Sequence, residues 1–480
     1  MSYPSYPYVR STGARTPTVG GRRRGTVALA LGVALVSACA TLSPDGGFGS
    51  VQRLVKERSN QNAQWFQNPA DSEAVRASLR ENLAHPLSAD DAVHIALINN
   101  RGLQATYAEL GVADAELVAA SWPRNPGFSF SHLQGGGEKE IERGLTLELV
   151  RLLTIPIAMR VERGRLEITQ LSIAAEVLDV VGQTRRAYFM AVAAQQVAAY
   201  MNQVREAAEA GAELARRMSK AGNWSKLDVA REQLFYADAT ALVARARQAA
   251  LSQREKLTRL MGLSGVELRF ELPERLPDLP AGIAEGSAVE ARALSDRLDV
   301  QALKKDLDGL ATSLGLTKAT RFINVLELGP KSKSETGRSR KDGYQISVEI
   351  PLFDWTGAKV AKAEYIYMQR ASHAAELAVN AQSEVREAFA SYRTNYELAR
   401  HYRDEVVPLR KRISDENQLR YNGMLISVFE LLADAREQVV SVNASIEALR
   451  DFWLAETDLQ SAMTGSSTAL TKAARTSSSQ

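Results

Sequence analysis

The amino-acid sequence predicts a mainly α-helical protein with a small β part, built from long antiparallel helical hairpins. Two stretches, 159–220 and 358–421, are rich in Ala, Glu, Arg, Gln and Leu, which favour helices. Each has roughly 60 residues, or about 90 Å of helix at 1.5 Å per residue. Before each stretch come two short runs in which apolar and polar residues alternate, as in β-strands. Because the same order of parts occurs twice, the sequence also predicts an internal two-fold repeat.

Composition excludes several classes of protein. With 480 residues, 45% of them hydrophobic, the chain has ample material for a large folded body. The net charge of +3 gives no reason to expect nucleic-acid binding, which needs a clustered basic face. One cysteine excludes a disulfide framework and a thiolate zinc site, and the five histidines include no i, i+4 pair. We expect no metal or other cofactor, and no combination of nucleophile and base suggests an enzyme.

The first segment has the composition of an export signal. Residues 1–38 contain five arginines and no acid, and they end in an apolar run of about a dozen residues, too short to span a membrane. The sequence Val36-Ser37-Ala38-Cys39 resembles the lipobox of bacterial lipoproteins. The resemblance implies that 1–38 is a lipoprotein signal peptide, that Cys39 carries a covalent lipid, and that 39–87 is a lipid-anchored N-terminal segment. The alternative is that Cys39 is a small apolar residue in a protein core.

The first copy of the repeat occupies 88–271. A helix-like run from 101 to about 121 comes first, and a pair of alternating runs, 127–153, follows with a polar loop in its middle. The long helical hairpin 159–262 completes the copy. Its second helix starts near Ser225, whose hydroxyl is a suitable N-cap.

The second copy, 290–463, repeats this order. It contains a helix-like run from 298 to about 318, a strand pair 322–353 and a long helical hairpin 358–463. Pro408 falls inside the first helix of that hairpin and is expected to kink it.

Two segments lie outside the copies. Residues 272–289 form a Pro-rich linker between the repeats, and 464–480 form a small, polar tail that we expect to be disordered.

The alternating runs predict strands with one apolar and one polar face. In the last run, Tyr344, Ile346 and Val348 point one way, while Gln345 and Ser347 point the other. Such strands fit either a half-buried soluble sheet or an outer-membrane barrel. Helices about 90 Å long leave no compact core for the apolar faces to cover. Because four strands are too few to close a barrel and open edges are not tolerated in lipid, we expect other copies of the chain to complete the sheet.

This arrangement resembles the TolC-type outer-membrane efflux proteins, and in particular their lipoprotein branch. The resemblance covers nearly the whole mature chain. It rests on the opening 87–100, the helix 109–120 with Pro123 after it, the segment 348–354 before the second long helix, and the turn 421–423. The sequence departs from the family at 150–155, where Val-Arg-Leu-Leu-Thr-Ile replaces the usual exit from the strand.

The resemblance implies a homotrimer in which twelve strands, four per chain, form one outer-membrane β-barrel and the helices form a periplasmic tunnel. It implies a periplasmic adaptor protein, an inner-membrane pump and outer-membrane lipid as partners. We therefore expect a lipid-anchored, membrane-spanning protein of the outer membrane that passively conducts small toxic molecules or ions to the exterior. One alternative is a channel for type I protein secretion. Another, from a different class, is a periplasmic coiled-coil adaptor lipoprotein.

Two glutamates are candidate lumen carboxylates. Glu148 and Glu349 fall on the polar side of their alternating runs. In a three-fold assembly each becomes a ring of carboxylates, and such rings favour cations. The alternative is that they are ordinary polar residues of the lumen without selectivity.

A second candidate set lies where the long helices turn back. The resemblance implies a periplasmic gate there, with Asp228, Glu430 and Asp434 as its acidic residues. The alternative is that all three are solvated acids on helix faces.

The hairpin tips are candidate contacts for the adaptor. The residues concerned are Gly222, Asn223 and Trp224 in the first copy and Gly423, Met424 and Leu425 in the second. Both glycines are also expected to cap helices with a positive φ. Packing within the tip is an equal alternative for Trp224.

Overall fold

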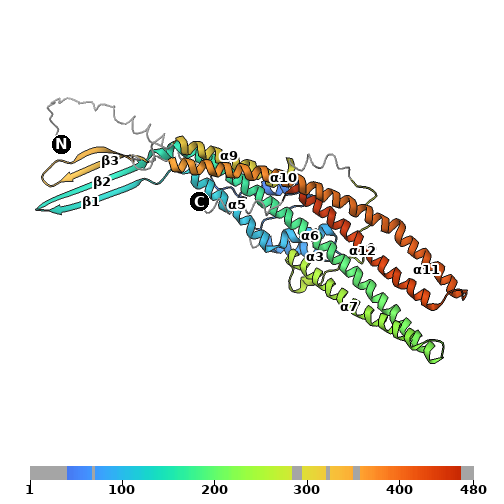
Figure 1. The fold of residues 1–480 in the computed structure, drawn as a ribbon. Coiled ribbons are helices and arrows are strands. Elements are labelled where there is room, and N and C mark those ends of the chain that lie inside the picture. The colour runs from blue at the N-terminus through green and yellow to red at the C-terminus, as the bar shows by residue number, and fades with distance from the viewer. Residues whose placement is uncertain (1–40, 67–70, 284–294, 320–324, 350–356, 466–480) are drawn as a thin grey trace, which may run out of the picture.

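The computed structural model describes residues 41–66, 71–283, 295–319, 325–349 and 357–465. Cys39 and the signal segment lie outside the described residues, as do residues 284–289 of the linker, both ends of the second strand pair and nearly all of the C-terminal tail. The described part is elongated, with a small sheet at one end and the tips of the helical hairpins at the other (Figure 1).

The described strands form one antiparallel sheet in the order β1-β2-β3-β4. Its strands are β1 (Gly127–Gly135), β2 (Glu138–Glu148), β3 (Leu326–Glu335) and β4 (Lys341–Val348). The register places Leu147 opposite Leu328, and Leu328 opposite Ile346. The sheet therefore joins one hairpin from each copy of the repeat, as the prediction of a small four-stranded β part requires.

The strands extend further from the helices than the alternating runs suggested. The polar segments in the middle of the two strand pairs, 134–140 and 329–342, belong largely to the strands rather than to loops. The first hairpin turns at Gly136 and Gly137, both with positive φ. Near this turn both faces of the sheet are polar, so the strands there show no apolar period. Cross-strand ion pairs such as Lys333 with Glu140 stabilise the pairing instead.

The predicted strand pair 127–153 is too long at its C-terminal end. Helix α6 (Leu149–Lys220) begins directly after β2, so 149–153 are helical rather than extended. Pro156 lies inside α6. The mainly apolar run 149–155 no longer alternates strictly, because polar residues occur only at Arg151 and Thr154. A short apolar run cannot distinguish a strand from a helix by period alone.

The first hairpin consists of α6 and α7 (Lys226–Met261), which lie antiparallel (Figure 1). Ser225 caps α7 as expected, since its hydroxyl accepts a hydrogen bond from the Asp228 N–H at 3.1 Å. At the other end Gly262 takes a φ of 67° and closes α7, because glycine adopts this region without steric cost.

The second copy contains α9 (Leu298–Ala319), α10 (Gly357–His401), α11 (Val407–Asn422) and α12 (Val428–Thr464). A π-helical segment, η3 (Tyr402–Val406), separates α10 from α11. The long helix is therefore interrupted by a π-turn just before Pro408, and the predicted kink itself stays a prediction.

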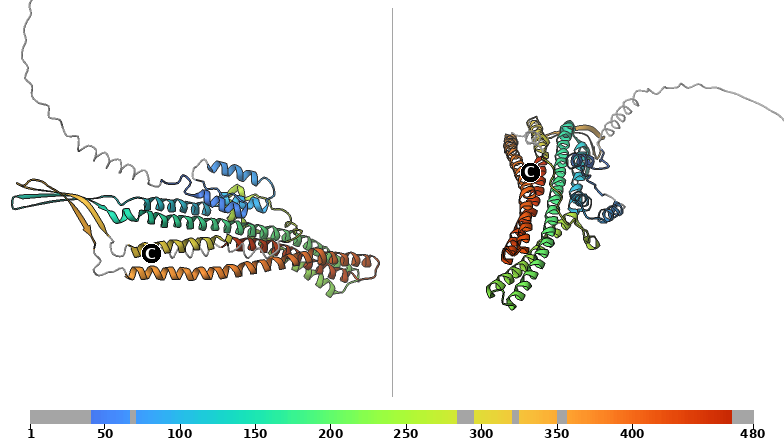
Figure 2. Two further views of the ribbon diagram at one scale, coloured as in Figure 1. Left: turned by 90° about the horizontal axis from the view of Figure 1, so that it is seen from above. Right: turned by 90° about the vertical axis from the view of Figure 1, so that its right-hand side faces the viewer.

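The N-terminal helices cover one side of the first long helix. These are α2 (Phe48–Ser59), α3 (Asp71–Asn82), α4 (Ala89–Asn99) and α5 (Arg101–Ser121). Figure 2 shows α2–α4 as a separate layer beside the long helices. Phe48 packs edge-on against Tyr107 of α5 with ring centroids 4.9 Å apart.

Within the described residues, no helix combines the length and the apolar character needed to cross a lipid bilayer.

A buried ion pair joins the start of α9 to the middle of α10 and the end of α12. Arg297, 1% exposed, donates to both carboxylate oxygens of Asp299, 0% exposed, at 3.0 and 2.7 Å. It also donates to Glu384 of α10 at 2.8 Å and to the carbonyl of Ala462 in α12 at 3.1 Å. Burial acts to lower the pKa of Arg297, but the hydrogen bonds and charges of Asp299 and Glu384 outweigh it and raise the pKa. The cluster fixes the start of α9 against α10 and α12.

Candidate functional site

One face of the sheet is apolar and uncovered in the chain. Its pairs include Phe128 with Leu145, and Leu147 with Leu328 and Ile346. The exposed large side chains on this apolar face are Phe128, Phe130, Leu145, Leu147, Leu328, Tyr344, Ile346 and Val348. Soluble monomers rarely expose so large a continuous apolar patch, so this face requires lipid or another chain as its partner.

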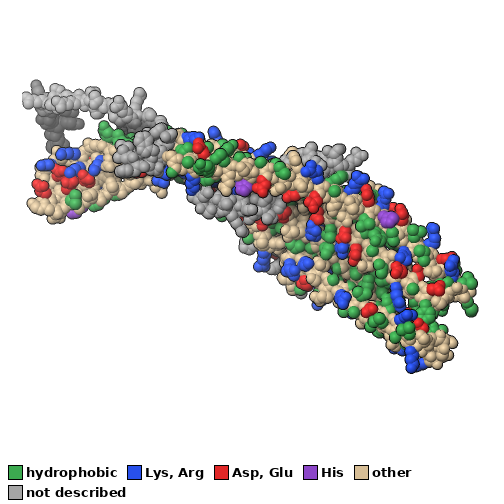
Figure 3. Space-filling view, in the orientation of Figure 1, with side chains coloured by type: hydrophobic (Ala, Val, Ile, Leu, Met, Phe, Trp, Pro, Cys, Tyr) green, Lys and Arg blue, Asp and Glu red, His purple; other side chains and the backbone are tan. Residues whose placement is uncertain are grey.

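The opposite, polar face carries paired charges. Lys333 contacts Glu140 at 2.7 Å and Glu335 at 3.0 Å, and Lys331 contacts Glu142 at 3.0 Å. Figure 3 shows acidic and basic side chains close together over the sheet. Such a face is compatible with water but not with hydrocarbon.

Both predicted lumen glutamates lie on this polar face, at the helical end of the sheet. Glu148 is directly opposite Glu327, and Glu327 is opposite Ser347, two residues before Glu349. Because directly opposed residues share a face, Glu148, Glu327 and Glu349 project to the same side. Glu327 was missed in the sequence, since the run 322–328 alternates poorly.

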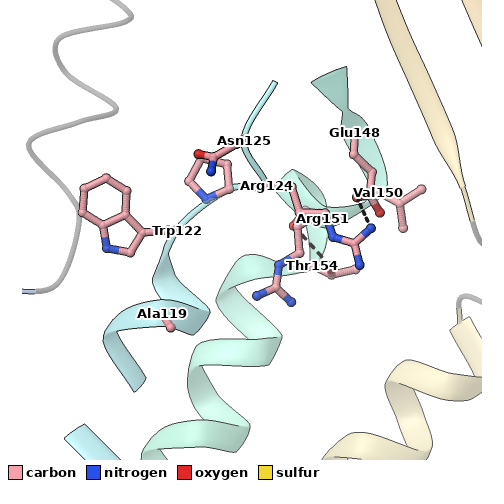
Figure 4. A pocket seen from close by; sticks show the side chains of 9 residues that line it. Ala119, Trp122, Arg124, Asn125, Glu148, Val150, Arg151 and Thr154 are labelled. Atoms are coloured by element: carbon pink, nitrogen blue, oxygen red, sulfur yellow. Dashed lines mark hydrogen bonds and ion pairs between the residues drawn. The ribbon is translucent and has the colours of Figure 1, made fainter. Parts of the chain in front are cut away.

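Glu148 is not a free carboxylate in the chain. It forms an ion pair with Arg124 at 3.1 Å (Figure 4). Both side chains border a hollow of about 560 Å³ between the end of α5 and the start of α6. Glu349 is exposed, and its N–H donates to the carbonyl of Val325 at 3.2 Å. Of the two predicted lumen carboxylates, Glu148 is therefore paired with a neighbouring cation, whereas Glu349 is exposed.

The two hairpin tips form the same turn. In the second tip, however, the turn lies one residue later relative to its glycine than in the first tip. The N–H groups of Asn223 and Leu425 donate to carbonyls five residues earlier, those of Met218 and Arg420, both at 2.9 Å. Gly222 takes a φ of 80° in the first tip, but in the second the left-handed residue is Met424, with a φ of 60°.

The expectation that Gly423 caps with a positive φ is therefore wrong. Gly423 has a φ of −79° and lies one position before the left-handed residue. The hydrogen bond from the Leu425 N–H to the Arg420 carbonyl fixes the position of the left-handed residue in this turn. It requires Met424, directly before Leu425, to adopt a positive φ, although Met424 has a side chain.

This displacement makes Asp228 and Glu430 structurally equivalent. Each is the third residue after a capping serine, Ser225 or Ser427, and its N–H donates to that serine hydroxyl. The Asp228 carboxylate also accepts a hydrogen bond of 2.5 Å from the Ser225 hydroxyl. Both acids thus have a local role at a helix start, and their role in a gate stays a prediction.

Asp434 is half-buried, and its Oδ2 atom has no hydrogen-bond partner in the described residues.

Trp224 packs within the tip region. Its indole stacks on Phe429 of α12 with ring centroids 4.4 Å apart and an interplanar angle of 24°. This contact joins the first hairpin to the second. The most exposed apolar side chains of the tips are Met424, 93% exposed, and Leu425, 78% exposed.

A second contact between the hairpins was not predicted. Arg436 of α12 forms an ion pair of 2.7 Å with Glu232 of α7, which is only 3% exposed. The guanidinium also lies over the ring of Phe235, 4.5 Å from its centroid. Each partner lies in an Ala-Arg-Glu-Gln segment, Glu232 in 230–233 and Arg436 in 435–438. The sequence alone does not show that these two residues meet.

Solved structures with the same architecture exist. CusC, described as forming a transmembrane channel, matches with a TM-score of 0.65 and 17% identity over 78% of this chain and 92% of its own. The Campylobacter jejuni CmeC outer membrane channel matches with a TM-score of 0.61 and 15% identity over 86% and 91%. The Neisseria gonorrhoeae MtrE outer membrane channel, in an open state, matches with a TM-score of 0.63 and 17% identity over 78% and 88%. The chain has the TolC-type channel fold.

The TolC-type fold explains why the sheet and the hairpins occur in one chain. Both copies of the repeat contribute a strand pair and a long helical hairpin, as the sequence predicted. No protein-family model and no curated protein sequence matches this chain. The three solved structures named above are each described as a channel.

Proposed function

We propose that this protein is the outer-membrane channel of a tripartite efflux system, which passively conducts small toxic molecules or ions to the exterior. The observation that carries the proposal is the sheet, whose exposed apolar face lies opposite a face of paired charges. That division suits strands with lipid on one side and water on the other. The channel fold and its outer-membrane relatives support the same placement.

The free edges of the sheet support a homotrimer. Among the residues that the structure describes, strands β1 and β4 each pair on one side only. In lipid every backbone N–H and C=O must be paired, so an open edge is not stable there. Pairing β1 of one copy with β4 of the next closes a ring, and three copies give a twelve-stranded barrel with the polar face inside. An adaptor lipoprotein, the alternative from another class, needs only one helical hairpin, whereas this chain has two.

The periplasmic end supplies the remaining partners. We propose that the gate lies where the hairpins turn, with Asp434, Asp228 and Glu430 near its opening. The exposed tip residues Met424 and Leu425 are the proposed contacts for a periplasmic adaptor, which connects to an inner-membrane pump. Cys39 is the proposed site of the lipid anchor, and the mass of the purified subunit reports whether a diacylglycerol is attached.

Removing the exposed lumen carboxylate is expected to reduce cation preference. In Glu349→Gln the cation-to-anion permeability ratio should fall roughly two- to threefold, because a ring of charges is lost. Glu148→Gln should have a smaller effect, since Arg124 already balances that carboxylate. Reversal potentials in planar bilayers under a salt gradient measure both ratios. Glu73→Gln, in α3 outside the sheet, is the control, and an unchanged ratio in Glu349→Gln would reject the proposed ring.

The proposed function itself is tested by adding the purified full-length protein to planar bilayers. Discrete conductance steps are expected once the periplasmic end opens. Their absence, both in the native protein and in variants that loosen contacts between the hairpins, would contradict a channel.

A further inference from the structure

Arg143 lies on the apolar face of the sheet, where the apolar part of that face ends. Along β2, Leu147 and Leu145 lie on this face, and Arg143 is the next residue on the same side, because the side chains of a strand alternate. Phe130 of β1 lies directly opposite Arg143. Towards the hairpin turns, which lie at the end of the sheet farthest from the helices (Figure 1), this side therefore changes from apolar to charged.

Exposed aromatic side chains mark this change. They are Phe128 and Phe130 of β1 and Tyr344 of β4. On membrane barrels, aromatic side chains gather at the two boundaries between the hydrocarbon and the headgroups. In the proposed channel this boundary belongs to the outer leaflet, because the turns of the sheet point away from the helices. Arg143 then lies at the level of the headgroups, where an arginine is tolerated far better than at the middle of the bilayer.

Arg143 has no partner of its own in the part of the chain that the structure describes. Its side chain is exposed, and among the described residues no hydrogen bond or ion pair engages its guanidinium group. On the polar face, by contrast, Lys331 contacts Glu142 at 3.0 Å and Lys333 contacts Glu140 at 2.7 Å. A cation at the edge of hydrocarbon is costly unless it is paired. Its partner must therefore come from outside the chain.

A second guanidinium group lies in the same row of the sheet. Ser332 of β3 is directly opposite Arg143, and on its other side it is opposite Asp342 of β4. The Asp342 carboxylate accepts a hydrogen bond of 2.8 Å from Arg340. Since neighbouring strands are about 4.8 Å apart, β2 and β4 are separated by roughly 10 Å in this row. The row holds two guanidinium groups and one carboxylate, so its charge is positive.

Most acidic residues at this end of the sheet face the other way. Glu140 and Glu142 of β2 lie on the polar face, because they alternate with Ile141 and Arg143. Glu335 of β3 is directly opposite Glu140 and shares its side. The acids are thus directed to the inside of the proposed barrel, and the outside is left positive. Charges that served only solubility would not need to be sorted by face.

We propose that Arg143, with Arg340 near it, binds the phosphate groups of a phosphorylated glycolipid of the outer leaflet. Guanidinium groups suit phosphates because they form paired, charge-assisted hydrogen bonds with them. Such a lipid holds its phosphates just above the hydrocarbon, at the level of Arg143, while its acyl chains cover Phe130 and the apolar face. The inference rests on the proposed function, which places the turns of the sheet outside the cell.

The site stays accessible in the proposed trimer. Arg143 lies on β2 and its neighbour Ser332 on β3, and these are the two inner strands of the sheet. Pairing of β1 with β4 of another copy therefore leaves the row uncovered, and each trimer presents the same site once per chain.

Binding of lipid A to the purified full-length protein in detergent tests the site. Lipid A is a glucosamine disaccharide with two phosphates, and the same lipid without phosphates is the control ligand. Native mass spectrometry measures the bound lipid over a series of lipid concentrations. In Arg143→Gln the affinity for phosphorylated lipid A should fall about five- to tenfold, because a charge-assisted contact is lost. Lys331→Gln, which removes a cation from the polar face of the same sheet, is the matched control and should bind as the native protein does.

The form of the lipid and the form of the side chain should depend on each other. Lipid A without phosphates should bind equally to the native protein and to Arg143→Gln, and Arg143→Lys should keep part of the affinity for the phosphorylated form. Equal affinities of the native protein and Arg143→Gln for phosphorylated lipid A, or an equal loss in Lys331→Gln, would overturn the site. Phosphatidylglycerol that binds as tightly, with the same dependence on Arg143, would contradict the assignment to a glycolipid.

Conductance of the same preparations in planar bilayers separates this inference from the proposed function. A conducting protein whose lipid binding does not depend on Arg143 would contradict the site alone. Lipid binding that depends on Arg143, in a protein that never conducts, would support the site and contradict the channel.

Discussion

Replacing Arg297 with alanine is expected to destabilise the protein by about 3–5 kcal/mol, the usual cost of removing one partner from a buried ion pair. Asp299 is fully buried, and the substitution would leave its carboxylate without the guanidinium that donates two hydrogen bonds to it at 3.0 and 2.7 Å. The substitution also removes the hydrogen bonds to Glu384 and to the Ala462 carbonyl, so α9 would lose its attachment to α10 and α12. The midpoint of thermal unfolding in detergent, followed by helical circular dichroism, measures the loss.

A double variant separates the cost of an unpaired charge from the value of the pair. Arg297→Met with Asp299→Leu removes both charges, and replacing a buried pair with apolar residues is often neutral. Its midpoint should therefore lie much closer to that of the native protein than the midpoint of Arg297→Ala does. If the single variant melts like the native protein, the cluster does not contribute to stability as described.

Loss of Arg436 is expected to open the periplasmic end. In Arg436→Ala, Glu232 would stay buried without its partner, and the cation–π contact with Phe235 would be lost as well. Truncating one partner of a buried charge pair typically costs about 2–5 kcal/mol, which is enough to shift a closed-to-open population strongly. Single-channel conductance in planar bilayers should rise several-fold.

Arg217→Ala is the matched control for this experiment. Arg217 lies close to the same tip, but its ion pair is with Glu213 on the same helix and is exposed. Surface pairs of this kind contribute about 0–1 kcal/mol, so its conductance should match that of the native protein. Equal increases in both variants would show that charge near the tip, rather than the contact between the hairpins, controls conduction.

The sequence predicted the long helices well because their signal is local. Helix-forming residues continue over 159–220, and Ser225 provides an N-cap that the structure confirms. The strands were predicted only where one face is apolar. Near Lys333 and Glu140 both faces are polar, and the pairing depends on contacts between distant segments that no local period reveals.

Less of the candidate site than of the fold could be predicted from the sequence. That Glu148 faces Glu327 depends on the register between β2 and β3, which lie far apart in the chain. The pairing of Glu232 with Arg436 likewise depends on which faces of α7 and α12 meet. A left-handed residue was expected at Gly423, but the hydrogen-bond pattern of the turn places it at Met424. Long-range packing decides all three features.

The most direct test of the proposed trimeric barrel is the native mass of the full-length protein in a mild detergent. In the proposed channel, the edges of β1 and β4 that are unpaired within the described residues pair with neighbouring copies, so that three chains form one closed ring. A single species with three times the subunit mass is expected. A stable, folded monomer that keeps its strands without detergent would contradict it.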